Sequence, residues 1–558
     1  MKVLVQGQGA VTLTDQDFIA SGGEGRLYAK GDIAYKLYSD PSRMIAPAKI
    51  DELRVLDRPN IIRPREVLYD SEGRPLGFTM SRVSGAVALP RLFTNDYRDR
   101  YRICADTTLD LVSELRRTIE FIHQHGILVV DGNELNYLVD ARRHVLPYCI
   151  DVDSFQTPSF PATAIMASIR DWTAQRFSRL TDWFSFAVVA CQLFVGIHPF
   201  KGRHPDFKPG DFEGRVKAGV SIFNKAVKVP SSARDFGQIP ANYRRWFVAL
   251  FERGERTPPP AEPGATLGSL PQRLVFGSDT LEVKEVQDFG ERLFGARTVN
   301  GTLLARTRSD LYVGHTRYAL RGPETVILDD ANRPVAFTVD NGSLVARWLG
   351  SGERLSSDLK AEQVVRAGNR VYVLSNDNLV EIGVLDLGGR PLLLAGNRWK
   401  VLANAVRAFD GVLLEDVLGK THAVIPFRHG ATAVLALPEL DPYRAVAARY
   451  EGRVLVVRGA TRGGRYDQWL FRFNESHDRY DVKVIEDTDA PINFAVLDTG
   501  VVVRVVEDGS LEAFANRPGS DLVRVIEDAQ IKVAMPLFNY AGRAAVFAQN
   551  KVFQMRSR

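Results

Sequence analysis

Cysteine is scarce in this chain, with three residues in a total of 558. Cys104, Cys149 and Cys191 lie far apart, and none belongs to a CxxC pair. An odd number of distant cysteines argues against a disulfide framework and against a cysteine-ligated zinc site. This cysteine content fits a reducing compartment, so we expect a cytoplasmic protein.

Long apolar runs are also missing. The N-terminus turns polar after a few residues and lacks the apolar core of roughly 7–15 residues that a signal peptide needs. The longest apolar stretch, 183–195, is shorter than the ~20 residues of a membrane-spanning helix. We therefore expect no membrane partner.

An excess of one charge sign is absent as well. The chain has 72 basic and 67 acidic residues, a net charge of +5, and no long run of either sign. Such a balance does not indicate nucleic acid as a partner. With 45% hydrophobic and 25% charged residues, the composition is that of folded globular protein. At ~100–200 residues per domain, the length predicts at least two domains.

The periodicity of apolar residues changes along the chain. The first ~90 residues alternate like strands and include one helical stretch at 46–56. Apolar residues then recur at helical spacing over 106–125, and helices dominate as far as residue 255. Proline and glycine are concentrated in 257–271, where neither a helix nor a strand persists. We predict a linker at 257–275.

The C-terminal part, 276–558, shows short alternating runs and almost no helical periodicity, which predicts an all-β domain. Glycines that open such runs are separated by 41, 26, 43, 41, 48 and 42 residues. Most steps match the ~40–50 residues of a four-stranded propeller blade, so we predict a six- or seven-bladed β-propeller. A pair of β-sandwiches is the alternative. These glycines are Gly301, Gly342, Gly368, Gly411, Gly452, Gly500 and Gly542.

Two elements near the N-terminus suit phosphate binding. The run SGGEGRLY places Gly23 and Gly25 where a backbone could approach phosphate without obstruction. Eleven residues after Gly25, Lys36 interrupts the apolar strand IAYKL and could reach the same phosphates. A plain hairpin turn and a solvated lysine on an edge strand are the alternative interpretations.

Two further elements follow the long helix. Asp131 and Asn136 lie five residues apart in VVDGNELN, a spacing that lets one accept a proton and the other ligate a metal. Ordinary turn chemistry would also place Asp and Asn there. Fifteen residues after Asn136, Asp151 ends the apolar strand YCI, where a carboxylate can bridge Mg²⁺ to phosphates.

In order and spacing, residues 15–256 resemble the protein-kinase superfamily. The resemblance implies a bilobal α+β domain over 1–256, with an N-lobe at about 1–83 and a C-lobe at about 84–256. It also implies ATP and Mg²⁺ as cofactors, catalysis by Asp131 and Lys36, and metal ligation by Asn136 and Asp151. The nucleotide-binding residues implied by the resemblance are Gly23, Gly25, Lys36, Met80 (gatekeeper), Ser81 and Val83 (hinge), Asn136 and Asp151.

Further similarities lie in the C-lobe. The run 181–200, TDWFSFAVVACQLFVGIHPF, resembles the buried F-helix and the loop after it. Arg256 resembles the arginine that closes the kinase helical lobe, and Asp171 is the nearest acid that could pair with it.

The chain also departs from the kinase pattern. The HRD triplet reads Val-Val-Asp at 129–131, and DFG reads Asp-Val-Asp at 151–153. Without the HRD arginine, control by phosphorylation of the activation segment is not expected. No glutamate stands at the usual spacing for pairing with Lys36, which leaves Asp51 and Glu52 as candidates.

We therefore expect a protein kinase that transfers the γ-phosphate of ATP to serine or threonine of a protein substrate. The all-β domain is expected to recruit substrate or regulate activity by binding a protein. Two alternatives stay open: a pseudokinase scaffold, and a small-molecule phosphotransferase of the aminoglycoside-kinase type.

Overall fold

The computed structural model describes residues 1–21, 24–261, 281–386, 391–402, 404–428, 431–461, 464–488, 490–507, 509–520, 523–526 and 531–557. The chain forms two compact units. The first comprises residues 1–98, 103–272 and 460–465, and the second comprises 99–102, 273–459 and 466–558. Most of the predicted linker, 257–275, lies outside the described residues.

The first unit begins with a seven-stranded antiparallel sheet in the order β2-β1-β6-β7-β5-β4-β3. Strand β5 lies near its middle and carries Lys36 between buried neighbours, so this lysine is not on an edge strand. The strands are β1 (Lys2–Val5), β2 (Gly9–Thr12), β3 (Phe18–Ser21), β4 (Gly25–Lys30), β5 (Ile33–Tyr38), β6 (Val67–Tyr69) and β7 (Pro75–Ser81).

One short helix, α1 (Pro47–Leu53), packs on this sheet where the sequence predicted a helix at 46–56. Its Ile50 joins a buried cluster with Tyr38, Val67 and Phe78 from three strands. Burying side chains of this size contributes about 1.5–3 kcal/mol each, which holds the helix to the strands.

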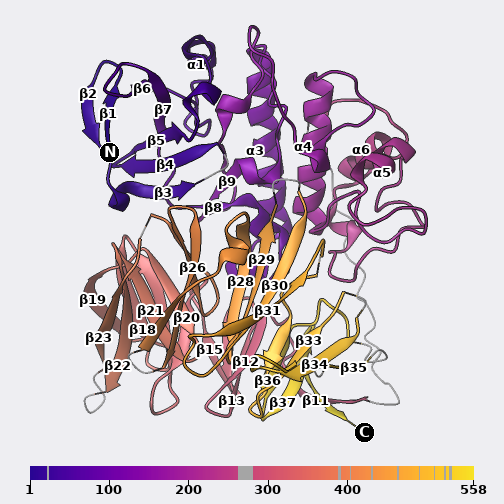
Figure 1. Cartoon of the computed structure of the whole chain (residues 1–558). Helices are drawn as coiled ribbons and strands as arrows, with labels where there is room; N and C mark the ends of the chain where they lie inside the picture. The colour runs from indigo at the N-terminus through magenta and orange to yellow at the C-terminus, as the bar shows by residue number, and fades with distance from the viewer. Residues whose placement is uncertain are drawn as a thin grey trace. The chain divides into compact units, whose positions relative to one another are not determined.

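Helices are the main regular elements in the remainder of the unit. Helix α3 matches the predicted span 106–125 to within one residue at each end. It lies beside α4 (Figure 1). The helices are α2 (Asn95–Tyr101), α3 (Ala105–Gln124), α4 (Arg179–Val195), α5 (Phe212–Ala218) and α6 (Ala241–Phe251). A small sheet, in the order β10-β9-β8, consists of β8 (Ala86–Ala88), β9 (Tyr137–Asp140) and β10 (Pro147–Cys149).

Helix α4 is the core of the helical part. Every residue from 181 to 195 is buried, as expected of a helix that is apolar on all sides. Ser178 caps its first turn, and Gly196, with φ of 77°, ends it in the left-handed conformation that glycine adopts at low cost. Within the described part of the chain, no helix has both the length and the apolar character needed to cross a membrane.

The described residues of the second unit form seven four-stranded sheets. Six contain strands that are consecutive in the chain, and the seventh joins the first strand of the unit to the last three, in the order β11-β38-β37-β36. Strands β11 and β38 pair antiparallel, from Leu281 opposite Ser557 to Asp288 opposite Lys551. This pairing closes the unit on itself.

The strands of the second unit are β11 (Leu281–Asp288), β12 (Gly295–Val299), β13 (Thr302–Arg306), β14 (Asp310–Val313), β15 (Thr316–Ala319), β16 (Thr325–Leu328), β17 (Pro334–Asp340), β18 (Ser343–Trp348), β19 (Arg354–Lys360), β20 (Gln363–Ala367), β21 (Arg370–Ser375), β22 (Asn378–Asp386), β23 (Pro391–Lys400), β24 (Val406–Ala408), β25 (Leu413–Val417), β26 (Lys420–Arg428), β27 (Ala431–Ala436), β28 (Arg444–Glu451), β29 (Val454–Ala460), β30 (Tyr466–Phe473), β31 (Tyr480–Ile485), β32 (Phe494–Val496), β33 (Val501–Val505), β34 (Leu511–Ala515), β35 (Val523–Ile526), β36 (Leu537–Tyr540), β37 (Arg543–Ala548) and β38 (Lys551–Ser557).

Apolar clusters join each sheet to the next. The closing sheet takes part in two of them: Val546 packs with Val503 of the preceding sheet, whereas Ala545 packs with Leu303 of the sheet that begins at β12. The order of clusters therefore returns to its starting point, and each sheet is covered on both faces.

Turn glycines explain the irregular spacing in the sequence. Six of the seven glycines lie in the first hairpin that consecutive strands of their sheet form. Gly301, for example, lies between β12 and β13 and has φ of 75°. Gly342 instead lies between β17 and β18, one hairpin later. In that sheet Asn332, with φ of 59°, takes the first hairpin. The 26-residue step thus reflects a different turn and not a missing sheet.

Candidate functional site

Lys36 meets two carboxylates from a distant part of the chain. Its Nζ lies 3.0 Å from Asp151 Oδ1 and 2.6 Å from Asp153 Oδ2, although 115 and 117 positions separate the partners. Strand β5 supplies the lysine, and the loop after β10 supplies the acids. A third carboxylate, that of Glu24 immediately before β4, lies 3.7 Å from the same nitrogen. The fold thus joins a lysine predicted to bind phosphate to an aspartate predicted to bind metal.

The catalytic candidates Asp131 and Asn136 share one loop. The Asn136 side-chain amide donates to the Asp131 carbonyl at 2.9 Å, and the Asn136 carbonyl accepts from the Ile150 backbone at 3.0 Å. These bonds tie the loop to the strand that leads to Asp151. The amide nitrogen is used within the loop, and the side-chain oxygen of Asn136 is the atom that could ligate a metal.

Asp182 of α4 binds the backbone of this loop. Its buried carboxylate accepts hydrogen bonds from the backbone amides of Val129 and Val130, at 2.8 and 2.9 Å, and contacts His123 of α3 at 2.8 Å. Val130 has φ of 59°, which a β-branched residue adopts only under strain of about 1–3 kcal/mol. The two bonds to Asp182 hold that conformation and set the direction of Asp131.

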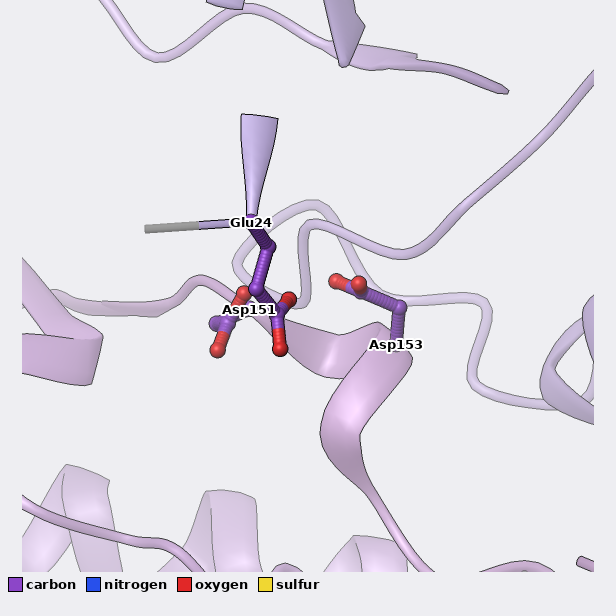
Figure 2. A group of neighbouring side chains, drawn as sticks. All are labelled: Glu24, Asp151 and Asp153. Atoms are coloured by element: carbon purple, nitrogen blue, oxygen red, sulfur yellow. The ribbon is translucent and has the colours of Figure 1, made fainter. Parts of the chain in front are cut away.

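The acidic cluster Glu24, Asp151 and Asp153 offers oxygen ligands for a divalent cation. One carboxylate oxygen from each lies within 4.8 Å of the others, and Figure 2 shows the three side chains approaching from β4 and from the loop after β10. Magnesium prefers such hard oxygen ligands. The side chain of Asp151 is 39% exposed and that of Asp153 only 6%, so Asp151 is the more accessible ligand.

Charge and burial shift the pKa of each central group. Burial and the adjacent Asp153 carboxylate raise the pKa of Asp151 to about 6. Burial would raise the pKa of Asp153 too, but the Lys36 ammonium lowers it below its usual value. Burial opposes the charge of Lys36, yet Asp153 and Asp151 raise its pKa well above the ordinary lysine value. Lys36 is therefore protonated and positively charged at neutral pH.

Asp131 stands apart from that cluster. Burial raises its pKa, and hydrogen bonds from the Met166 backbone and the Asn133 side chain partly offset this. The Met166 amide donates to Asp131 Oδ1 at 2.8 Å. A carboxyl with a raised pKa is suited to accepting a proton during a reaction.

Arg256 and His198 help to fix the segment between Asp151 and α4. Arg256 forms a bidentate ion pair with buried Asp171, at 2.6 and 2.8 Å, as the sequence predicted. His198 contacts the Ser168 carbonyl through Nε2 at 2.9 Å and accepts from the Phe200 amide through Nδ1 at 3.1 Å. One ring nitrogen donates and the other accepts, which is the pattern of a neutral imidazole. Burial lowers the pKa of His198 to about 3.

The other predicted nucleotide-binding residues lie on β4 and around the end of β7. Gly25 opposes Tyr38, and a Cβ there would come 2.0 Å from the Leu37 carbonyl, so close strand pairing requires glycine. Met80 packs beside the cluster around Phe78, and Ser81 ends β7. Val83 is half-buried after that strand, and Gly23 lies outside the described residues.

Comparison with known proteins finds similarity over part of the chain. No protein-family model matches. Serine/threonine-protein kinase ppk21 of Schizosaccharomyces pombe is 25% identical over 188 residues, covering 28% of this chain and 34% of that kinase. Serine/threonine/tyrosine-protein kinase HT1 of Arabidopsis thaliana is 24% identical over 149 residues, covering 26% of this chain and 35% of that kinase.

Part of this chain is similar in sequence to protein kinases. The chain spans about a third of the length of these two relatives.

The structure adds four residues to the candidate site: Glu24, described above, and Asp153, Tyr38 and Lys49. Tyr38 donates its hydroxyl proton to Asp153 at 2.7 Å, and Lys49 of α1 donates to the Asp153 carbonyl at 2.7 Å. The sequence signalled Asp153 through its departure from DFG, which puts an acid where that motif has glycine. Tyr38 and Lys49 carry no such signal, because an aromatic strand residue and a helix lysine are common.

The acids considered as partners of Lys36 have other partners. Asp51 pairs with Arg54 at 3.3 Å, and Glu52 accepts from the Ser159 amide at 3.3 Å. Among the described residues, the carboxylates paired with Lys36 are Glu24, Asp151 and Asp153. Neither of the two candidate acids of α1 is therefore paired with Lys36, and α1 directs Lys49 toward the site instead.

Proposed function

We propose that this chain is an ATP- and Mg²⁺-dependent protein kinase that transfers the γ-phosphate to serine or threonine hydroxyls. The contact between Lys36 and Asp151 carries the proposal, because it joins a fixed cation and a metal-binding carboxylate across 115 positions. Phosphoryl transfer requires neutralised phosphates and an aligned acceptor. Lys36 and a metal held by Asp151 would meet the first need, and Asp131 would meet the second.

Each polar group has a role in the proposed reaction. Lys36 would bind the α- and β-phosphates, and Asp151 with the side-chain oxygen of Asn136 would hold Mg²⁺. The metal, when bound, would neutralise charge on the phosphates. Asp131 would orient the acceptor hydroxyl and take its proton, for which its raised pKa is suited. Met80, Ser81 and Val83 would contact the adenine.

We further propose that the second unit is a seven-bladed β-propeller. Seven four-stranded sheets, a last sheet completed by β11, and a closed order of apolar clusters support this fold. Propellers most often bind proteins, so this unit would recruit the substrate or a regulatory partner.

Incubation of the full chain with MgATP, followed by phosphosite mapping, tests the proposal. We expect phosphate on serine or threonine of the chain itself or of an added protein, and loss of this signal in an Asp131→Asn variant. Equal labelling by both proteins would assign the activity to a contaminant. Phosphate found on an aminoglycoside and on no protein would identify a small-molecule phosphotransferase, and nucleotide binding without transfer would identify a scaffold.

A further inference from the structure

Asp153 is the deepest acid of the cluster around Lys36. The exposed fraction of its side chain is 6%, compared with 39% for Asp151 and 60% for Glu24. It is also the closest acid, since its Oδ2 lies 2.6 Å from the Lys36 Nζ. A carboxylate that is buried beside a cation is retained there, because separation would leave a charge unpaired in a poorly solvated place.

Asp153 is held from two further directions. The Tyr38 hydroxyl donates to the carboxylate oxygen that also contacts Lys36, at 2.7 Å. On the backbone side, Lys49 of α1 donates to the Asp153 carbonyl at 2.7 Å. The sheet and the helix thus fix both the carboxylate and the backbone of this residue.

Helix α1 provides no acid for the same task among its described residues. Its two acids are paired elsewhere, Asp51 with Arg54 and Glu52 with the Ser159 amide. The residue that α1 directs toward the site is buried Lys49, which has the same charge sign as Lys36. The anchor for Lys36 must therefore come from another element.

We propose that Asp153 is the positioning residue that holds Lys36 in place and thereby leaves Asp151 for the metal, an inference that rests on the proposed function. The Lys36 ammonium contacts two carboxylates, and one of these contacts is enough to hold the lysine in position. The buried, doubly held Asp153 keeps the lysine, whereas the more exposed Asp151 can exchange it for a cation. Without Asp153, Lys36 would be left with Asp151 as its nearest acid, and a metal would compete with the lysine for that carboxylate.

The dependence of ATP binding on Mg²⁺ tests this division of work. The affinity for ATP is measured by calorimetric titration of the full chain at graded Mg²⁺ concentrations and in EDTA. The half-effect Mg²⁺ concentration is the one at which half of the Mg²⁺-induced change in ATP affinity is reached. In an Asp153→Asn variant we expect that concentration to rise about 10- to 100-fold, the range typical of residues that support a metal ligand. Binding in EDTA is expected to change much less. An unchanged Mg²⁺ dependence would overturn the inference.

Two further variants sharpen the test. Glu52→Gln removes a nearby acid that lies outside the Lys36 contacts, and we expect its Mg²⁺ dependence to match that of the unmodified protein. Lys49→Glu, added to Asp153→Asn, returns a carboxylate to the site from α1. We expect it to lower the half-effect Mg²⁺ concentration part of the way back to that of the unmodified protein. Absence of recovery together with a normal Glu52→Gln response would argue that Asp153 acts by local packing and overturn the positioning role.

A variant that keeps the acid covers the case in which Asp153→Asn fails to fold. Tyr38→Phe removes one hydrogen bond to the carboxylate, and we expect the half-effect Mg²⁺ concentration to rise about threefold or more. No change in a folded Tyr38→Phe protein would then overturn the inference. Failure of the unmodified chain to bind ATP at any Mg²⁺ concentration would instead contradict the proposed function, so the two failures are distinguishable.

Discussion

Replacing Asp182 by alanine is expected to release the loop of the first unit that carries Asp131. The carboxylate of Asp182 is buried and accepts the backbone amides of Val129 and Val130. Alanine provides no acceptor, and water has little access to these amides. The loop must either keep two unsatisfied donors or move away from α4.

The structure sets the size of this effect. A hydrogen bond to a charged group contributes about 1.5–3 kcal/mol, so two contribute about 3–6 kcal/mol. Release of the loop also relieves the strain of Val130, about 1–3 kcal/mol, which offsets part of the loss. We expect a net loss of about 3 kcal/mol in the free energy of unfolding. For a unit of this size, that corresponds to a fall in Tm of about 6–12 °C.

Differential scanning calorimetry of the full chain measures this shift. The control is Asp110→Ala, which removes an exposed acid from α3 and should change stability by less than about 0.5 kcal/mol. The transition of the second unit should stay in place in both variants. A Tm for Asp182→Ala equal to that of the control would show that these bonds do not hold the loop, and the argument on Val130 would fail with it.

Three other predictions concern the same unit. Asp131→Asn should lower the rate of phosphate transfer about 10²- to 10⁴-fold while ATP affinity, measured by calorimetry, stays near that of the unmodified protein; an unchanged rate would remove Asp131 from the chemistry. Arg256→Lys should cost about 3 kcal/mol in denaturant unfolding, because lysine cannot reproduce the bidentate pair with Asp171, and a loss below 1 kcal/mol would contradict this. His198 has a folded-state pKa of about 3, below its unfolded value near 6.5, so the unfolded chain binds more protons in that window. Its contribution to stability is complete above about pH 6.5 and should decline by about 1.4 kcal/mol per pH unit below it; a His198→Gln variant with the same pH dependence between pH 5 and 7 would refute this.

Local patterns in the sequence predicted much of the first unit. Helical spacing predicted α3, the apolar run predicted α4, and the position of Arg256 identified its pairing with Asp171. These features depend on residues that are close in sequence or on a single pair of opposite charges. Alternation predicted the all-β nature of the second unit for the same reason.

The partner of Lys36 could not be predicted in this way. Its contact with Asp153 depends on where a loop returns after 117 residues, and on α1 directing Lys49 instead of an acid toward the site. The number of sheets was also ambiguous, because Gly342 and Asn332 exchange the roles that turn residues have in the other sheets. Any residue that tolerates positive φ serves in such a turn, so glycine spacing alone does not count sheets.

The pairing of β11 with β38 has a consequence for how the second unit forms. The two strands are separated by more than 260 positions, as the contact between Lys551 and Glu285 shows. During synthesis β11 emerges long before its partner, so one sheet stays incomplete until residues 551–557 have left the ribosome. Contacts of such sequence separation form slowly, and the waiting strand edges are prone to misassembly. We expect the second unit to acquire resistance to proteases last, in a single late step that nascent chains ending before β38 do not reach.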